Sequence, residues 1–345
     1  MDTLTTIDIY NQSLEGLVTN VRDRNATFLV TGASGLIGSV IVDLLMLANT
    51  KGYECKVFAL GRSKEKLENK FSGYINNKHF HIISQDIRES IDDNLKFDYI
   101  IHGASNADPV SYASYPAETM MTTISGTYNV LEYGRKHPNC RIVCLSTFEV
   151  YGYNHSDIYN EDAVGLLDFN VLRACYPESK RSAEVLVHSY FDEYKVNVNI
   201  ARLSSVYGPT MSDTDSKAHA QFFLNALRGE NIVLKSKGEQ KRSYTYVLDA
   251  VSGILTILFE GEPNHCYNIS NEMSIATIAE VAQTIAGISD TKVVFDVPTD
   301  LEAKGFSKPQ NCILDNSKLK SLGWSGQYTL EKGLLECYWI LKQKQ

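Results

Sequence analysis

The sequence has no long hydrophobic run and no excess of basic residues. Its most apolar window, residues 35–48, is interrupted by Ser39 and Asp43 and falls short of the roughly 20 apolar residues that a membrane span needs. The chain carries 33 Lys and Arg against 41 Asp and Glu, a formal charge of −8. It therefore lacks the basic footprint with which nucleic-acid-binding proteins neutralise phosphates. From these two absences we expect that the protein binds no nucleic acid and does not associate with a membrane.

The seven cysteines and eight histidines show no pattern of pairing or of metal ligation. No two cysteines have C-x-x-C spacing, and a chain this long does not depend on disulfides to stabilise its core. Residues 1–20 contain Asp2, Asp8 and Glu15 but no basic residue, unlike a secretory signal peptide. We expect free thiols, no metal site and a cytoplasmic location.

Strand-like and helix-like segments alternate through the first 200 residues. Strands separated by helices form right-handed βαβ units, so the pattern predicts an α/β fold with a doubly wound parallel sheet. The predicted strands are 27–31, 56–60, 80–84, 99–102, 141–145 and 197–203, and the predicted helices are 36–48, 119–135 and 177–194.

After Pro209 the alternation gives way to shorter, mixed segments. We expect a smaller mixed α/β domain whose segments interleave with the last parts of the sheet. Helices are predicted at 218–229, 248–259, 275–286, 315–321 and 329–342, with strands at 231–235 and 292–296.

A glycine-rich turn follows the first predicted strand and opens the first long helix. In the pattern Gly32-x-x-Gly35-x-x-Gly38, the first glycine allows the tight turn, the second lets the backbone approach a pyrophosphate, and the third lets helix and strand pack closely. The helix N-terminus directs N–H groups and a positive dipole end towards the phosphates. This context predicts a Rossmann-type dinucleotide site made of Gly32, Ser34, Gly35, Leu36, Ile37 and Gly38.

The end of the second predicted strand indicates which dinucleotide binds. An acid there would indicate NAD, but this sequence has Arg62 and Ser63, which can hold a 2′-phosphate. The turn favours NADP slightly, with NAD as the alternative if Arg62 and Lys64 only begin a solvated, charged helix. Asp86, after the third strand, is placed either to bond the adenine amino group or to cap the following turn.

Tyr176 and Lys180 are four residues apart, on one face of a predicted helix. A phenol has an ordinary pKa of about 10 and is a poor base at neutral pH. A neighbouring ammonium and the positive nicotinamide ring of an oxidised cofactor would favour the phenolate. Ser146 and Thr147, at the end of the preceding strand, offer a hydroxyl that could share the substrate proton with the phenol.

The order of these motifs resembles the extended short-chain dehydrogenase/reductase family, which includes nucleotide-sugar epimerases, 4,6-dehydratases and UDP-glucuronate decarboxylases. The resemblance covers most of residues 27–345, and the stretch 173–181 is most similar to the decarboxylase and dehydratase-like branches. It rests on residues 31–38, 86–88, 102–105, 126–130, 145–152, 176–181, 202–209, 242–249 and 314–324.

The resemblance implies a role for each matching residue. Tyr176 would take the proton of a sugar hydroxyl, at C4, Thr147 would bridge that hydroxyl and the phenol, and Lys180 would lower the phenol pKa and bond the nicotinamide ribose. Tightly bound NAD(P) and a UDP-, dTDP- or CDP-linked sugar are implied as ligands. The implied cofactor set further includes Ile87, Ala104 and Ser105, and the implied substrate set is Asn106, Phe148, Ser205 and Arg242, with Arg242 on the diphosphate.

Two departures from the family pattern bear on the reaction. A 4,6-dehydratase needs a general acid beside the catalytic Thr, and Phe148 at that position cannot donate a proton. Glu149 and Arg242 fit the decarboxylase pattern, although a small Ser is usual at 148, and Ser205 replaces a common Asn. We therefore expect oxidation at C4 followed by decarboxylation or 4-epimerisation of the 4-keto sugar.

The resemblance also leaves other possibilities open. An NADPH-dependent keto-sugar reductase fits the basic turn at residue 62, and a non-catalytic dinucleotide sensor would need neither Tyr176 nor Lys180. Helices 119–135 and 177–194 either form a homodimer or only pack on the sheet.

The chain is expected to divide into three parts. These are a helical extension at 1–25, a dinucleotide-binding domain at 26–205 plus about 236–262, and a substrate domain at about 206–235 plus 263–345.

Overall fold

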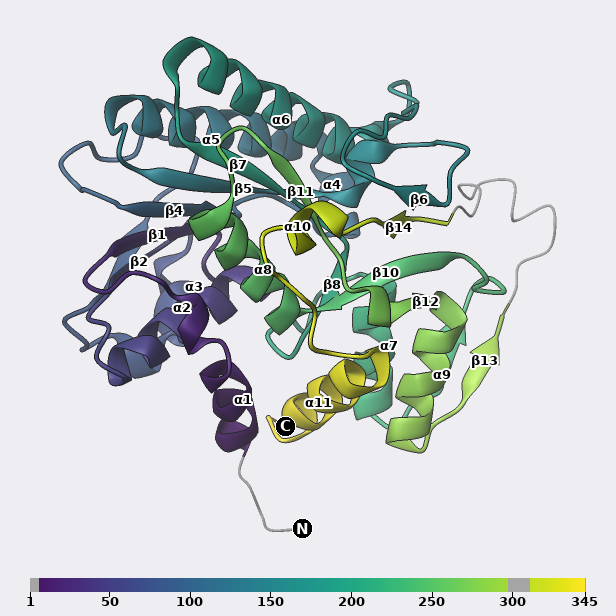
Figure 1. Ribbon diagram of the computed structural model, residues 1–345. Helices are drawn as coiled ribbons and strands as arrows, with labels where there is room; N and C mark the ends of the chain where they lie inside the picture. The colour runs from purple at the N-terminus through teal and green to yellow at the C-terminus, as the bar shows by residue number, and fades with distance from the viewer. Residues whose placement is uncertain (1–5, 297–310, 345) are drawn as a thin grey trace.

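The computed structural model describes residues 6–296 and 311–344, and a parallel sheet of seven strands forms its centre (Figure 1). The strand order is β3-β2-β1-β4-β5-β7-β11, and every neighbouring pair is parallel. The chain adds β2 and β3 on one side of β1, then returns to place β4 on its other side. The strands are β1 (Thr27–Thr31), β2 (Lys56–Gly61), β3 (Phe80–Ser84), β4 (Tyr99–His102), β5 (Arg141–Thr147), β7 (Val198–Leu203) and β11 (Cys266–Ile269).

Helices cover both faces of this sheet. Alternate strand residues point to opposite faces: Phe28 and Val30 of β1 pack into the core below α2 and α8, whereas Leu29 joins the core below α5 and α6. Burial on both faces explains the continuous apolar runs of the central strands. The covering helices are α2 (Leu36–Thr50), α8 (Val247–Glu260), α5 (Pro116–Lys136) and α6 (Cys175–Tyr194), with α3 (Lys64–Lys70) after β2.

Smaller sheets and shorter helices lie beside the central sheet. A three-stranded sheet contains β8 (Ser205–Tyr207), β10 (Lys241–Tyr246) and β12 (Ile275–Thr277). The two-stranded pairs are β9 (Ile232–Leu234) with β13 (Val293–Phe295), and β6 (Ile158–Tyr159) with β14 (Ile313–Leu314). The remaining helices are α1 (Thr6–Glu15), α4 (Pro109–Ser114), α7 (Ala218–Leu227), α9 (Ile278–Ser289), α10 (Ser317–Lys320) and α11 (Leu330–Lys342).

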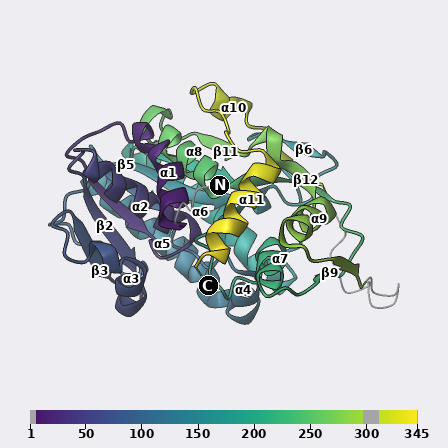
Figure 2. The ribbon, with the colours of Figure 1, turned by 90° about the horizontal axis from the view of Figure 1, so that it is seen from below.

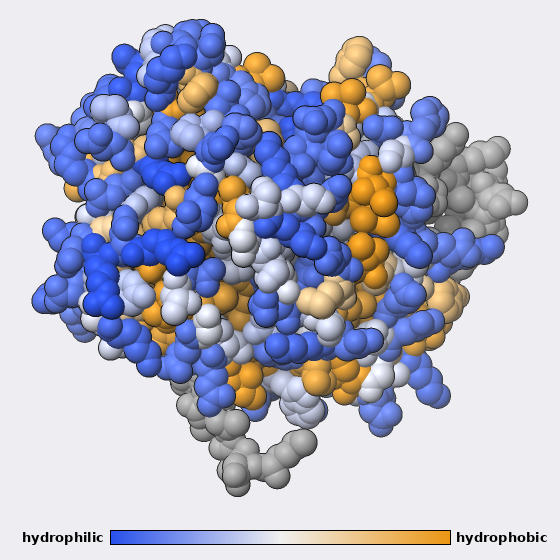
Figure 3. All heavy atoms as spheres, viewed as in Figure 1, coloured by the Kyte–Doolittle hydropathy of each residue, from blue (hydrophilic) through white to orange (hydrophobic). Residues whose placement is uncertain are grey.

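The two ends of the described chain lie close together. Helix α11 contacts both α1 and α9, and Figure 2 shows it between them. On the face shown in Figure 3, hydrophilic residues predominate and hydrophobic ones are interspersed among them. No helix of residues 6–296 and 311–344 has the length and apolar character needed to cross a bilayer.

The predicted α/β fold with a parallel, doubly wound sheet is confirmed, and the structure differs from the predicted elements in several details. β11, in the stretch expected to belong to the substrate domain, is an edge strand of the large sheet, whereas β10 pairs in the three-stranded sheet. The helix expected at 275–286 begins at Ile278, because Thr277 and Glu280 form a capping box that ends β12. The expected N-terminal helix spans Thr6–Glu15.

Asp249, at the start of α8, joins that helix to the segment before α11. The carboxylate accepts hydrogen bonds from Asn271 Nδ2 at 2.7 Å, from the Gln327 amide at 2.8 Å and from the Tyr328 amide at 3.2 Å. Burial raises the pKa of Asp249, and these donors act in the opposite direction. The carboxylate therefore satisfies three donors in a place with little access to water.

We predict that Asp249→Ala lowers the free energy of unfolding by about 3 kcal/mol, because it leaves buried donors without an acceptor. Urea unfolding followed by circular dichroism measures this, with Glu272→Ala as the control, since Glu272 forms an exposed ion pair with Lys320. Equal unfolding energies for the two variants would contradict the role given to Asp249.

Candidate active site

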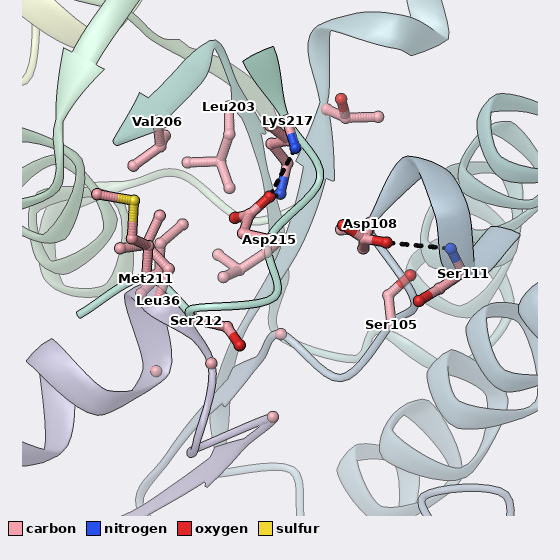
Figure 4. Close-up of a pocket in the computed structure, with 18 of the residues that line it drawn as sticks. Leu36, Ser105, Asp108, Ser111, Leu203, Val206, Met211, Ser212, Asp215 and Lys217 are labelled. Atoms are coloured by element: carbon pink, nitrogen blue, oxygen red, sulfur yellow. Dashed lines mark hydrogen bonds and ion pairs between the residues drawn. The ribbon is translucent and has the colours of Figure 1, made fainter. Parts of the chain in front are cut away.

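A cavity of about 1030 Å³ opens at the carboxyl ends of the central strands. Its walls include Thr31 and Gly32 after β1, Gly103 after β4, Thr147 at the end of β5 and Ser205 in β8. β1 is where the strand order reverses, the place at which open α/β sheets bind ligands. Figure 4 shows Leu36 and Met211 on one side of the cavity, and Ser105, Asp108 and Ser111 on the other.

The glycine turn leaves no room for side chains where it meets its neighbours. Gly32 has φ +67°, and a Cβ there would lie 2.9 Å from the carbonyl oxygen of Gly103. A Cβ on Gly38 would lie 2.5 Å from the Gly32 carbonyl oxygen. Gly35 caps α2 without a side-chain hydrogen bond, and the first helical turn contains no acid. The first amides of α2 therefore remain available to an anion, which fits a dinucleotide pyrophosphate.

The structure brings Tyr176, Lys180 and Thr147 together on one side of this cavity. Tyr176 and Lys180 are buried on α6, and Thr147 ends β5, where its hydroxyl accepts the amide of Glu149 at 3.3 Å. The Lys180 amine donates to the carbonyl oxygen of Leu145 at 2.7 Å, so the end of β5 holds the lysine in place.

Burial dominates the protonation of both side chains on α6. It raises the pKa of Tyr176 well above its ordinary value, and the Glu149 carboxylate adds to this, while the Thr147 hydroxyl and Arg173 act in the opposite direction. Burial lowers the pKa of Lys180 to about 8. The phenol is therefore protonated in the protein alone, and a further positive charge beside it would favour the phenolate.

Glu149, Phe148 and Arg242 line the same cavity. Glu149 pairs with Arg173 at 2.8 Å, and the Arg242 guanidinium lies 5.8 Å from the centre of the Phe148 ring. Arg242 Nε is buried and has no hydrogen-bond partner in the described chain. A buried, unsatisfied guanidinium donor is costly, which points to an anionic ligand at Arg242.

Most of the predicted cofactor and substrate residues also face the cavity. All six residues of the glycine turn do so, together with Ser63, Ser105 and Ser205. The Ser63 side chain caps α3 through the Lys66 amide at 3.2 Å, and the Ser105 hydroxyl lies 3.0 Å from that of Thr123.

Five predicted residues are not among the lining residues of this cavity. Arg62 forms an exposed ion pair with Glu118 at 2.6 Å, and Asp86 accepts the guanidinium of Arg88, which lowers the carboxyl pKa. Ile87 packs in the core, the Ala104 amide donates to the Thr31 hydroxyl, and Asn106 reaches Thr119 at 3.4 Å.

Two residues near Tyr176 were not predicted from the sequence as part of the site. The Tyr112 ring stacks on the Tyr176 ring with centroids 5.3 Å apart, and burial raises the pKa of Tyr112 to about 12. The Arg173 guanidinium lies 5.6 Å from the centre of the Tyr112 ring. Arg173 stands in the segment most similar to the decarboxylase branch, so its sequence position offered a signal, whereas Tyr112 in the short α4 offered none.

Asp108, also in the cavity wall, links α4 to the segment before α7. Its carboxylate accepts the amide of Ser216 at 2.8 Å and the hydroxyl of the same residue at 2.7 Å. This contact closes one side of the cavity between parts of the chain 108 residues apart. Within residues 6–296 and 311–344, no group of three or more His, Cys, Asp or Glu could hold a metal ion.

The chain matches the NAD dependent epimerase/dehydratase family over residues 28–270. UDP-glucuronic acid decarboxylase 6 of Arabidopsis thaliana is 33% identical over 315 residues, which cover 90% of this chain and 87% of that protein. UDP-glucuronic acid decarboxylase 1 of Xenopus tropicalis is 32% identical over 312 residues, covering 89% and 70%.

Solved structures of nucleotide-sugar enzymes share the fold. UDP-glucose 4-epimerase from Thermotoga maritima, solved with UDP-glucose, superposes with a TM-score of 0.77 at 25% identity and covers 92% of this chain and 99% of its own. dTDP-glucose 4,6-dehydratase from Bacillus anthracis, solved with NAD, gives 0.75 at 23% identity, with 91% and 96% covered.

We predict that Gly38→Ala weakens dinucleotide binding at least about tenfold, because the new methyl group forces α2 away from the Gly32 carbonyl. Titration calorimetry with NAD and NADP measures the change. Gly287→Ala in α9 is the control, since nothing lies within 4 Å of a Cβ at that position. Equal affinities in both variants and the parent would show that the close approach at Gly38 does not support the site.

Proposed function

We propose, because the chain belongs to the NAD dependent epimerase/dehydratase family, that it oxidises a UDP-linked uronic acid at C4 and decarboxylates the 4-keto sugar. One observation carries the proposal. Tyr176, Lys180 and Thr147 share a single cavity with the glycine turn, with Glu149 and with Arg242. At about 1030 Å³ the cavity lies at the upper end of ligand pockets, which suits two nucleotides rather than one.

The residues of this chain would bind and position both ligands. The first turn of α2 holds the dinucleotide phosphates, and Lys180 bonds the nicotinamide ribose. When bound, the oxidised nicotinamide supplies the acceptor for the hydrogen and electron pair of the sugar C4–H bond. Tyr176 accepts the C4 hydroxyl proton as this bond breaks, and Thr147 orients the hydroxyl towards the phenol.

The 4-keto sugar then loses its C5 carboxylate as CO₂. The electron pair of the broken bond moves towards the C4 carbonyl oxygen, and Tyr176, now protonated, donates a hydrogen bond to that oxygen. C5 must next receive a proton, and Glu149 is an acid–base group that lines the cavity near Tyr176. As the hydrogen and electron pair return to C4, Tyr176 gives its proton back to the C4 oxygen, so the net change is the loss of one CO₂ and the cofactor ends oxidised. Arg242, whose Nε has no partner in the described chain, is suited to the substrate diphosphate.

Phe148 argues against dehydration of the 4-keto sugar. Loss of the C6 hydroxyl needs a proton donor at this position, and the ring, packed near Arg242, has none. Epimerisation at C4 needs only the Tyr–Lys pair and room for the keto sugar to turn over. It is the second candidate, favoured by the 25% identity to UDP-glucose 4-epimerase over nearly the whole chain.

We predict that the protein converts UDP-glucuronate to a product lighter by one CO₂, identified by mass spectrometry, and that Tyr176→Phe lowers the turnover number by about 10²–10⁴-fold. The variant removes one hydroxyl and keeps the ring stacked on Tyr112. UDP-glucose and dTDP-glucose are run in parallel. An isomer of equal mass would establish epimerisation instead, and loss of water would contradict the role of Phe148.

We further propose that NADP binds somewhat more tightly than NAD, with NAD as the alternative. The support is Arg62 at the end of β2. Its pair with Glu118 is more than one-third exposed on both sides, so opening it costs about 1 kcal/mol or less. A 2′-phosphate can then replace the Glu118 carboxylate as the partner of the guanidinium.

We predict that Arg62→Ala weakens NADP binding about tenfold and leaves NAD binding unchanged, as measured by titration calorimetry. Lys64→Ala is the matched control, since Lys64 forms an exposed pair with Glu68 on the same helix. A parent protein that binds NAD more tightly, with no effect of the Arg62 change, would overturn the NADP preference.

We also propose a homodimer and a cytoplasmic location. Met121 and Tyr128 of α5 and Val185 of α6 are exposed apolar residues on helices that pack against each other, a surface that a second copy could cover. All seven cysteines are free thiols, as a reducing compartment would leave them.

A further inference from the structure

A second, much smaller cavity lies behind the Lys180 side chain. Its volume is about 10 Å³, close to the space that one water molecule needs. Lys180 and Glu184, one helical turn apart on α6, both line it, as do Ser146 on β5 and Thr127 on α5. The lining is mixed, with apolar groups such as Val187 and Ile200 beside these polar side chains. The donors and acceptors among the polar side chains suit a bridging water.

Glu184 is held firmly at one end of this cavity. Its carboxylate accepts the Ser146 hydroxyl at 2.5 Å and the Arg202 guanidinium through Nε at 3.1 Å and Nη2 at 2.7 Å. Arg202 also donates to the Glu161 carbonyl oxygen at 2.7 Å and to the Tyr151 hydroxyl at 3.1 Å. The carboxylate therefore cannot swing away, and its charge stays on the Lys180 side of α6.

The Lys180 ammonium has N–H donors left to bond an acceptor in this small cavity. An ammonium has three N–H donors, and one is directed to the Leu145 carbonyl oxygen. The Lys180–Glu184 pair has no direct ion pair in the described part of the chain, although opposite charges four apart on a helix commonly form one. The small cavity lies between parts of these two side chains, so a water there can accept from Lys180 and donate to Glu184.

In the protein alone, the other titratable groups around Lys180 do not offer it a negative charge. Burial raises the pKa of the Tyr176 phenol on the same helix, so the phenol is neutral. His102 on β4 lies 2.8 Å from the Thr31 hydroxyl and 3.3 Å from that of Thr127, and burial lowers its pKa to about 3, so it is neutral. Burial raises the pKa of the Cys144 thiol on β5 to about 12. Arg202 on β7 is cationic. Glu184 is thus the acidic group that faces Lys180 from the elements packed around it.

We propose that Glu184 is a positioning residue that acts through one water in this cavity to keep Lys180 protonated and directed towards the nicotinamide ribose. The effect opposes the burial of Lys180, which by itself disfavours the ammonium. The proposal depends on the proposed function only in that Lys180 serves the reaction. Glu184 touches neither the reacting atoms nor the main cavity.

The test is the pH dependence of acetylation of Lys180 by acetic anhydride in the full-length protein, followed by peptide mass analysis. We predict a midpoint near pH 8 in the parent, and a midpoint about one pH unit lower in Glu184→Gln, because the opposing charge is lost. The alkaline limb of the pH–rate profile moves in the same direction. Acetylation needs no sugar nucleotide, so this result stands even if the predicted decarboxylation is not found.

Glu178→Gln is the matched control: Glu178 lies on the same helix, pairs with Arg181 at 3.6 Å and is not among the residues that line either cavity. Its midpoint should equal that of the parent. A folded Glu184→Gln protein with an unmoved midpoint overturns the proposal.

If Glu184→Gln does not fold, because Arg202 loses its partner, Ser146→Ala replaces it and keeps the Glu184–Arg202 pair. The carboxylate then loses a hydrogen-bond donor and presents more of its charge to Lys180, so the midpoint rises. An unmoved midpoint in Ser146→Ala overturns the proposal equally.

Discussion

The reversal of strand order at β1 is the constraint on which the rest of the structure depends. β2 pairs with one edge of β1 and β4 with the other, so the connections after β1 and β4 leave the sheet in opposite directions. The cavity opens at that point. The glycine turn lines one part of the cavity, and the end of β5 brings Thr147 next to Tyr176 of α6, with Lys180 one helical turn further on. The volume of this cavity, about 1030 Å³, suits a dinucleotide beside a sugar nucleotide.

The close approach of helix and turn makes this arrangement possible. Gly32 meets the backbone after β4, and Gly38 meets Gly32, so the amides of the first turn of α2 point into the cavity rather than at a side chain. Around the same cavity lie the cations Lys180, Arg173 and Arg242. A protein with a net charge of −8 thereby presents positive groups where phosphates and carboxylates would bind.

The elements marked by local sequence patterns could be predicted from the sequence. An element that depends on pairing with a distant strand could not. The strands beginning at Thr27, Lys56, Phe80, Tyr99 and Arg141 appear where their apolar runs predict them. β11 was not predicted from the sequence, because it is four residues long, contains the buried polar Asn268 and pairs with β7, more than 60 residues away. Residues Thr277 to Glu280, by contrast, carried a capping-box signal for the true start of α9.

The same difference applies to the site. Tyr176, Lys180, Thr147 and Arg242 carry motifs, and the structure gathers them around one cavity. The pairing of Asp86 with Arg88 and of Arg62 with Glu118 depends on side-chain geometry that no spacing rule expresses. The links between Glu184 and both Ser146 and Arg202 join segments 38 and 18 residues apart. These links became visible only when β5, β7 and α6 were placed together.

In the proposed reaction, the sugar C4–H bond breaks while Tyr176 takes the C4 hydroxyl proton. The most direct test of this step is a single-turnover experiment that follows the appearance of reduced nicotinamide after the protein with bound cofactor is mixed with UDP-glucuronate. We predict that deuterium at C4 slows the appearance of reduced nicotinamide and that deuterium at C3 does not. An equal rate with deuterium at C4, or reduction slowed by the C3 label instead, would contradict it.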